Sequence, residues 1–427
     1  MPIPPDAVPE FSLIQQTRGD EEGLVLTIVK CCFASQETRF VYVVFETNHD
    51  VPDAAENKIT LWDVDFDNDA DQVAYHHAVH DLALSHIFPL LSAVAHDTLL
   101  RSPGGIPTFT LSTVDGSVQL IPGMVKSMME TETRWLQRLP SVDTVPDLAP
   151  AVVYDIDDIK VIDFLVGGSR GAMLAILPDQ PGSCFVTLWI PTFTVFAWSD
   201  EDDHAQGILH EMAFLRTIPP HPHIISPPVG YISRVHDGKR VLCGYLVKYY
   251  TGGSLGEPER VSAPIATRIK WAYQIASGLH HLHHVGHTYH GDIKLDNVVL
   301  DENGDAVLID FEQGRTNEEN AAPELHAASL VSNDTVPRLA SRDRPYDIWK
   351  DTPRAIEAAE VWSFATVLRP LLSDVDAASA ILARCRSEDP NCRPTFGELE
   401  EFFQDLHPKR MVCCGPHWSS PETLRSS

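Results

Sequence analysis

Residues 289–300 form a polar segment whose residue types and spacing narrow the possible folds more than any other part of the chain. The segment contains Asp292, Lys294 and Asn297, and Asp310 follows the short apolar run at 306–309. Carboxylate and amide oxygens suit a hard cation such as Mg2+, and an ammonium group suits a phosphate. An ordinary polar loop would have to combine all four residue types at this spacing by chance. We therefore interpret this segment as a site that binds a metal ion and a phosphate group.

Other motifs follow this segment in a recognisable order. His290-Gly291-Asp292 is followed by Ala322-Pro323-Glu324, then by a helix-like stretch starting at Glu360, then by an Asp-Pro-x-x-Arg-Pro stretch that contains Arg393. This order resembles the eukaryotic protein kinases over about 250 residues. The resemblance implies an α+β, bilobal protein-kinase fold at residues 155–408. It divides into a β-rich N-lobe (155–247), a hinge (248–254) and a helical C-lobe (255–408). It also implies that Arg393 pairs with Glu324.

The resemblance further implies a role for each polar residue of the site. Asp292 would be the catalytic base, and Lys294 would lie against the phosphate that is transferred. Asn297 and Asp310 would hold Mg2+, so ATP and Mg2+ are the implied cofactors. A lysine two residues after the catalytic aspartate is the arrangement of serine/threonine kinases.

The N-lobe shows similar but weaker matches. Gly168, Arg170 and Gly171 resemble the glycine-rich loop, although Val166 stands where its first glycine is expected. Glu211 fits the glutamate of the αC helix. The remaining nucleotide contacts implied by the resemblance come from the gatekeeper and the hinge: Val247, Lys248, Tyr249, Tyr250 and Ser254.

Several positions depart from the kinase pattern. Trp189 stands where the β3 lysine should grip the phosphates, and no lysine occurs between Lys160 and Lys239. Glu211 therefore lacks its usual partner, and Arg170 is the nearest cation that could substitute. Glu312 replaces the glycine after Asp310-Phe311.

Gly291 replaces the arginine that pairs with a phosphorylated activation loop in many kinases, and Thr316 is the only hydroxyl residue between Asp310 and Glu324. Switching by phosphorylation of this loop is therefore not expected. Three interpretations stay open: a serine/threonine kinase of reduced activity, a pseudokinase that binds nucleotide or acts as a scaffold, and a small-molecule phosphotransferase.

The remaining residues indicate a second folded part. Strand-like stretches at 24–29 and 39–45, a helical stretch near 72–100 and a hairpin around Asp115-Gly116 predict a separate α+β module at 20–135. We expect flexible tails at 1–19 and 409–427, and a proline-containing linker at 136–154.

The amino-acid composition limits the classes of partner that this protein is expected to bind. The net charge of −28, without a visible Lys/Arg patch, argues against nucleic acid, and no apolar stretch is long enough to cross a membrane. Without a signal pattern or CxxC spacing, we expect free thiols and an intracellular protein, cytoplasmic or nuclear. A protein substrate or binding partner is implied. We interpret the acidic stretch 63–71 and the histidines at 76–80 and 280–290 as ordinary polar residues and not as metal sites.

Overall fold

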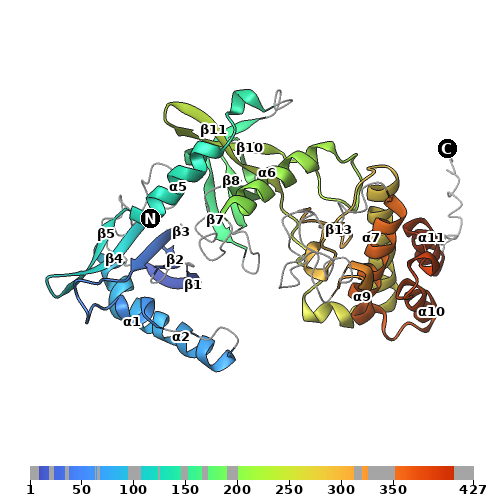
Figure 1. The fold of residues 1–427 in the computed structure, drawn as a ribbon, viewed down its shortest axis with the longest axis horizontal. Helices are drawn as coiled ribbons and strands as arrows, with labels where there is room; N and C mark the ends of the chain where they lie inside the picture. Colours follow the sequence, from blue (N-terminus) through green and yellow to red (C-terminus); the bar gives the residue numbers. More distant parts are fainter. Residues whose placement is uncertain are drawn as a thin grey trace, which may run out of the picture. The chain divides into compact units, whose positions relative to one another are not determined.

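The computed structural model describes residues 9–18, 24–33, 38–62, 64, 68–94, 107–123, 126–145, 152–165, 172–189, 201–311, 320–325 and 352–407. The chain divides into two compact units (Figure 1). The sheet unit comprises Met1–Pro220, Ile225–Tyr250 and Asp310–Gly314, and the helical unit comprises His221–Ile224, Thr251–Ile309 and Arg315–Ser427. The division after Tyr250 falls inside the expected hinge.

The sheet unit begins with a five-stranded sheet in the order β1-β2-β3-β4-β5. Its strands are β1 (Glu10–Arg18), β2 (Leu24–Cys32), β3 (Thr38–Glu46), β4 (Thr108–Val114) and β5 (Ser117–Pro122). The predicted strands and hairpin are confirmed. Asp115 and Gly116 both have positive φ, 50° and 76°, as a tight two-residue hairpin turn requires.

Strand β1 corrects the expectation of a flexible tail at 1–19. It pairs antiparallel with β2 from Glu10↔Cys32 to Arg18↔Val25. Phe11 and Leu13 pack against the hydrophobic core of the sheet. Apolar residues at alternate positions reach the same face of a strand, and this burial fixes the segment despite its short length.

Helices cover one face of this sheet: α1 (Asn57–Thr60), α2 (Asp69–Leu82), the π-helical turn η1 (Ala83–Ile87) and α3 (Phe88–Ala93). Val25, Val43 and Phe45 from the strands pack there with Val79 and Leu82 from α2. In Figure 1, α1 and α2 lie together beside β1–β3. The predicted helical stretch near 72–100 contains most of α2, which begins at Asp69, and all of η1 and α3.

The opposite face of β2 and β3 is buried as well. Successive strand residues point to opposite faces, yet Leu26, Ile28, Phe40, Tyr42 and Val44 are all at most 3% exposed. Two-sided burial means that a second layer covers this sheet.

Part of that second layer comes from β7 (Lys160–Phe164), which leads toward the expected glycine-rich loop. The ring of Phe164 packs edge-on against Phe40 and Tyr42, at centroid distances of 4.9 and 6.3 Å. Lys30 Nζ lies 3.3 Å from Asp163 Oδ1. The N-terminal module therefore packs against the N-lobe, while it keeps a sheet and a hydrophobic core of its own.

The N-lobe sheet has six strands in the order β6-β10-β11-β9-β8-β7. They are β6 (Val153–Asp155), β7, β8 (Met173–Leu177), β9 (Gln180–Trp189), β10 (Gly230–His236) and β11 (Lys239–Lys248). Helix α6 (Glu201–Thr217) follows β9. The expected linker is partly structured, because it contains the end of α5 (Lys126–Arg138), the turn η2 (Val142–Thr144) and the start of β6.

The helical unit is built on α7 (Ile265–His284), α9 (Pro353–Leu372), α10 (Asp376–Cys385) and α11 (Phe396–Leu406). Pro353 opens α9 at a position where no backbone donor is needed, and a Thr395–Glu398 capping box opens α11. The remaining elements carry the loops: η5 (Pro258–Ser262), η6 (Leu295–Asn297), β12 (Val298–Leu300), β13 (Ala306–Leu308) and η8 (Pro390–Cys392). None of the helices in the described part of the chain is both long and apolar enough to span a membrane.

Candidate active site

In the helical unit, Asp292 lies at the centre of a compact polar cluster. Lys294 Nζ donates to Asp292 Oδ2 at 2.6 Å. Asn297 Nδ2 donates to the same oxygen at 3.1 Å and to the Asp292 carbonyl at 2.9 Å. Asn297 is buried, and the Asp292 side chain is 14% exposed. The structure thus brings together the three residues that the sequence assigned to catalysis.

His290 shapes the backbone before this cluster. Its Nε2 lies 3.0 Å from the Ile309 carbonyl, and its Nδ1 accepts from the Asp292 N–H at 3.3 Å. A ring with its proton on Nε2 satisfies both contacts. The Ile309 N–H in turn donates to the Asn297 carbonyl at 3.0 Å. These bonds join the Asp292 loop to the strand that precedes Asp310.

Glu360 on α9 anchors the same loop from the core. This fully buried carboxylate accepts from the backbone N–H groups of His290 and Gly291, at 3.1 and 2.7 Å. Its second oxygen lies 2.7 Å from His283 Nε2 on α7. Burial alone would raise the pKa of Glu360, but the hydrogen bond to His283 and the nearby charges and backbone donors outweigh it and lower the pKa.

Gly291 has a φ of 89°. This left-handed conformation favours glycine, so the residue that replaces the arginine of many kinases also suits the backbone here. The sequence singled out Gly291 for a missing phosphate contact, and the structure adds this conformational role.

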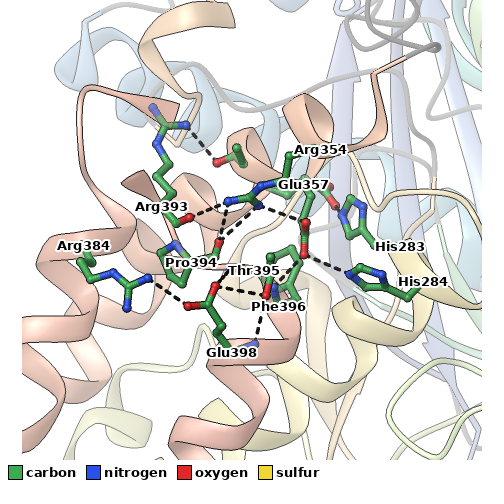
Figure 2. Close-up of polar contacts among 12 residues, drawn as sticks. His283, His284, Arg354, Glu357, Arg384, Arg393, Pro394, Thr395, Phe396 and Glu398 are labelled. Carbon is green, nitrogen blue, oxygen red and sulfur yellow. Dashed lines mark hydrogen bonds and ion pairs between the residues drawn. The ribbon is translucent and has the colours of Figure 1, made fainter. Parts of the chain in front are cut away.

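The predicted Arg393–Glu324 pair is confirmed. Arg393 Nη2 lies 2.9 Å from Glu324 Oε2, and its other nitrogens donate to the carbonyls of Ala358 and Ser387. The side chain of Arg393 is fully buried. Figure 2 shows it beside the neighbouring network in which Arg354 and the Phe396 N–H bind Glu357. Arg393 therefore connects the segment 320–325, which contains Glu324, to α9.

The comparisons with known proteins agree with this geometry. The family model described as "Protein kinase domain" matches residues 195–372. Residues 195–372 of this chain therefore form a domain of the protein kinase superfamily. The match includes the Asp292 cluster, Glu324 and Glu360, and it ends at the last residue of α9.

Curated relatives of the kinase domain are similar at low identity. "Fatty acyl-CoA synthetase and RNA processing-associated kinase 1" of Saccharomyces cerevisiae is 29% identical over 168 residues, covering 38% of this chain and 18% of that protein. The human "Nik-related protein kinase" is 29% identical over 175 residues, covering 38% and 11%. The rat "Dual specificity testis-specific protein kinase 2" is 26% identical over 237 residues, covering 47% and 38%. The matches span less than two thirds of each relative.

In the sheet unit, the buried glutamate of α6 is held by a tyrosine hydroxyl and a backbone N–H. Glu211 on α6 is 5% exposed; its Oε2 accepts from Tyr245 OH at 2.7 Å, and its Oε1 accepts from the Phe311 N–H at 2.9 Å. The backbone of Trp189 lies at the end of β9, opposite Gly244 of β11. Position 189 is therefore on the strand where the sequence placed the missing lysine.

The expected hinge residues occupy the end of β11 and the turn after it. Val247 is buried and pairs with Val186 of β9. Lys248 Nζ lies 5.0 Å from the centre of the Tyr250 ring, and the hydroxyl of Tyr250 accepts from the Ser226 N–H. Tyr249 is half-buried. The side chains of Lys248 and Tyr250 therefore have partners within the sheet unit, and the backbone of this segment stays the expected nucleotide contact.

The expected nucleotide contact Ser254 has hydrogen-bond partners within the protein. Its hydroxyl donates to the Leu295 carbonyl at 3.1 Å and accepts from the Gly256 N–H at 2.9 Å. In this structure Ser254 therefore joins the end of the hinge to the turn of η6, next to the Asp292 loop. Gly168, Arg170, Gly171, Glu312 and Thr316 lie outside the described residues.

His280, His283 and His284 on α7 lie against carboxylates. His280 Nδ1 lies 2.6 Å from Glu400, and His284 Nε2 lies 3.3 Å from Glu357. His281 stacks on His221. Across the residues that the structure describes, no group of three or more His, Cys, Asp or Glu side chains could hold a metal ion.

Sequence reasoning missed three positioning residues. The sequence placed Glu360 at the start of the motif helix but did not predict that it binds the Asp292 loop, and His283 and Tyr245 received no role. A glutamate at the motif position was a usable signal for the first. The bond between Tyr245 and Glu211 joins a strand and a helix far apart in sequence, and no local pattern indicates it.

Proposed function

We propose that this chain is a slow protein phosphotransferase of the serine/threonine type that uses ATP and Mg2+. The observation that carries the proposal is the Asp292 cluster, in which Lys294 and Asn297 both bind Asp292 Oδ2. Phosphoryl transfer depends on placed charges more than on covalent chemistry by the protein. A cluster held this firmly by the core supplies such placement.

In the proposed reaction, Asp292 orients the acceptor hydroxyl and takes its proton on the carboxylate, while the acceptor oxygen bonds to the γ-phosphorus of ATP and the bond to the leaving ADP oxygen breaks. Lys294, whose side chain is one-third exposed, can leave Asp292 Oδ2 and contact the phosphate that is transferred. Glu360 keeps the loop backbone fixed while these side chains move, because its partners are backbone N–H groups. The hydroxyl of a serine or threonine in a protein is the acceptor we propose.

Asn297 and Asp310 would hold the cation. The amide nitrogen of Asn297 makes both of its bonds to Asp292, so its amide oxygen is the atom that would bind the cation. Asp310 supplies a carboxylate from a backbone with φ of 67°, and such sparsely populated conformations are concentrated at functional sites. One carboxylate and one amide oxygen fit Mg2+, which would neutralise charge on the phosphates of ATP.

The missing lysine sets the expected rate. Removing one well-placed contact to a developing charge costs about 3–4 kcal/mol of barrier, which is about two to three decades in rate. Trp189 cannot make that contact, because indole carries only a neutral N–H donor. We therefore expect a slow enzyme.

A pseudokinase is the second candidate. The observation that favours it is the same substitution at Trp189, together with Glu211 already bonded to Tyr245 and Phe311. A small-molecule phosphotransferase is less well supported, because enzymes of that class lack the motifs from which the Arg393–Glu324 pair is built.

The deciding experiment measures Mg-ATP binding by calorimetry, and phosphate transfer to a protein substrate mixture, for the wild type and for Asp292→Ala. The proposal expects binding by both proteins and transfer by the wild type alone. Binding without transfer in either protein supports the pseudokinase. Absence of binding by the wild type defeats both nucleotide-dependent functions.

We further propose that the protein binds another protein, as substrate or partner, and does not bind nucleic acid or span a membrane. We propose a cytoplasmic or nuclear location. The net charge of −28 supports the exclusion of polyanions.

A further inference from the structure

The carboxylate of Glu211 connects three segments of the sheet unit. Tyr245 OH, from the middle of β11, binds one of its oxygens, and the Phe311 N–H binds the other. One helical turn later on α6, Phe214 stacks on the ring of Phe311 with centroids 5.4 Å apart. Helix α6 therefore holds the segment after Asp310 through a backbone bond and a ring contact.

A buried carboxylate requires such donors. Removing a charged group from water costs several kcal/mol unless hydrogen bonds replace its hydration. In the kinase pattern a lysine serves this carboxylate, and this chain has none between Lys160 and Lys239. Tyr245, 1% exposed, supplies a donor at 2.7 Å from a rigid ring fixed within the sheet.

Tyrosine and lysine differ in what they can do at this place. The lysine of the family holds the helix and also grips phosphates, whereas a phenol whose hydroxyl binds Glu211 performs only the first task. The Glu211 side chain is thereby bonded to the sheet by a neutral donor.

We infer that Tyr245 is a positioning residue: its hydroxyl fixes Glu211, which holds the Phe311 N–H and so sets the backbone at Asp310. Tyr245 therefore influences the position of the Asp310 carboxylate, and so the binding of the cation, without contacting phosphate. This inference rests on the proposed function insofar as Asp310 binds Mg2+.

The first test is Tyr245→Phe, which removes only the hydroxyl. Hydrogen exchange of the Phe311 amide, and of the α6 amides near Glu211, is expected to become about tenfold faster, the low end for losing a hydrogen bond to a charged group. The Mg2+ concentration that half-saturates phosphate transfer is expected to rise by a similar factor, with a smaller change in the half-saturating ATP concentration at excess Mg2+.

Tyr231→Phe is the matched control. Tyr231 is 3% exposed and lies directly opposite Tyr245 in the β10–β11 ladder, so this variant also removes a buried phenol hydroxyl from the same sheet. Wild-type exchange at Phe311 and a wild-type Mg2+ requirement are expected for it. If Tyr231→Phe accelerates exchange at Phe311 as much as Tyr245→Phe does, the effect is general loosening and the inference is overturned.

Glu211→Gln supplies a second, independent variant. Because Tyr245 is inferred to act through Glu211, the double variant should exchange little faster at Phe311 than the more affected single variant. Additive effects, or wild-type exchange in Tyr245→Phe, would overturn the inference. A wild type that neither binds Mg-ATP nor transfers phosphate would refute the proposed function, while the exchange measurements would still decide the role of Tyr245.

Discussion

Replacing Glu360 by alanine should strongly destabilise the helical unit. The substitution leaves the N–H groups of His290 and Gly291 and the ring of His283 without their buried acceptor. Hydrogen bonds to a charged group contribute about 1.5–3 kcal/mol each, and removing one member of a buried ionic pair costs about 3–5 kcal/mol. Since the variant also avoids burying the carboxylate, we expect a net loss of about 3–4 kcal/mol.

The measurement is native-state hydrogen exchange of the full chain, with protection followed in α7 and α9. This method reports the free energy of opening of one unit, even where unfolding of the whole chain is not a single transition. A loss of 3–4 kcal/mol corresponds to exchange that is some hundreds of times faster. Phosphate transfer should fall in parallel, because the Asp292 loop loses its anchor.

Glu400→Ala is the matched control. Glu400 also joins two helices by binding His280 and Ser277, but its side chain is 25% exposed. Water can replace those bonds, so about 1 kcal/mol is expected. The reasoning fails if Glu360→Ala reduces protection by less than about 1 kcal/mol, or if the two variants are equally destabilised.

Three other predictions concern stability. Arg393→Met should lower the free energy of unfolding by about 3 kcal/mol, because it strands Glu324; a melting temperature within 2 °C of wild type, a shift of only about 1 kcal/mol, would contradict this. Burial and two neighbouring imidazoles lower the pKa of His221 from 6.5 to about 4. As the pH falls, the unfolded chain therefore protonates this imidazole before the folded chain does. The free energy of unfolding of the helical unit should fall by about 1–2 kcal/mol between pH 7 and 4.5, allowing for partial solvation. His221→Asn should reduce that loss, and an unchanged pH profile would refute the assignment. Phe164→Ala removes the ring that packs on Phe40 and should cost about 3 kcal/mol, seen as faster proteolysis within 24–46; unchanged proteolysis would show that this contact contributes little.

The sequence predicted that Asp292, Lys294 and Asn297 lie together, because their spacing is local. Asp292, Lys294 and Asn297 are close together in the chain, so their spacing alone limits their geometry. The Arg393–Glu324 pair joins distant residues, and it was accessible only through the motifs that surround both. Physical reasoning from composition or periodicity would not have found it.

The bond between Tyr245 and Glu211 could not be predicted in this way. A buried tyrosine needs a partner for its hydroxyl, but the partner depends on how α6 packs against β11. By contrast, the sequence did contain a pattern that indicates packing of the N-terminal module against another layer. The stretches 24–29 and 39–45 are nearly continuous in apolar residues, as in strands buried on both faces, whereas alternation would have indicated one solvated face. Strand β1 was missed because its apolar positions are few and its register depends on β2.

Two-sided burial of β2 and β3 bears on where this protein can be cut. The family match begins at residue 195, after β9. A fragment that starts there would lack β6–β9 and keep only β10 and β11 of the six-stranded sheet, and one that starts at residue 155 would expose Phe164 and leave β10 without β6. Open strand edges and bare aromatic rings promote aggregation. The shortest fragment of this kinase domain that stays in solution should therefore include the N-terminal sheet, and shorter fragments that aggregate would say nothing about whether the full chain transfers phosphate.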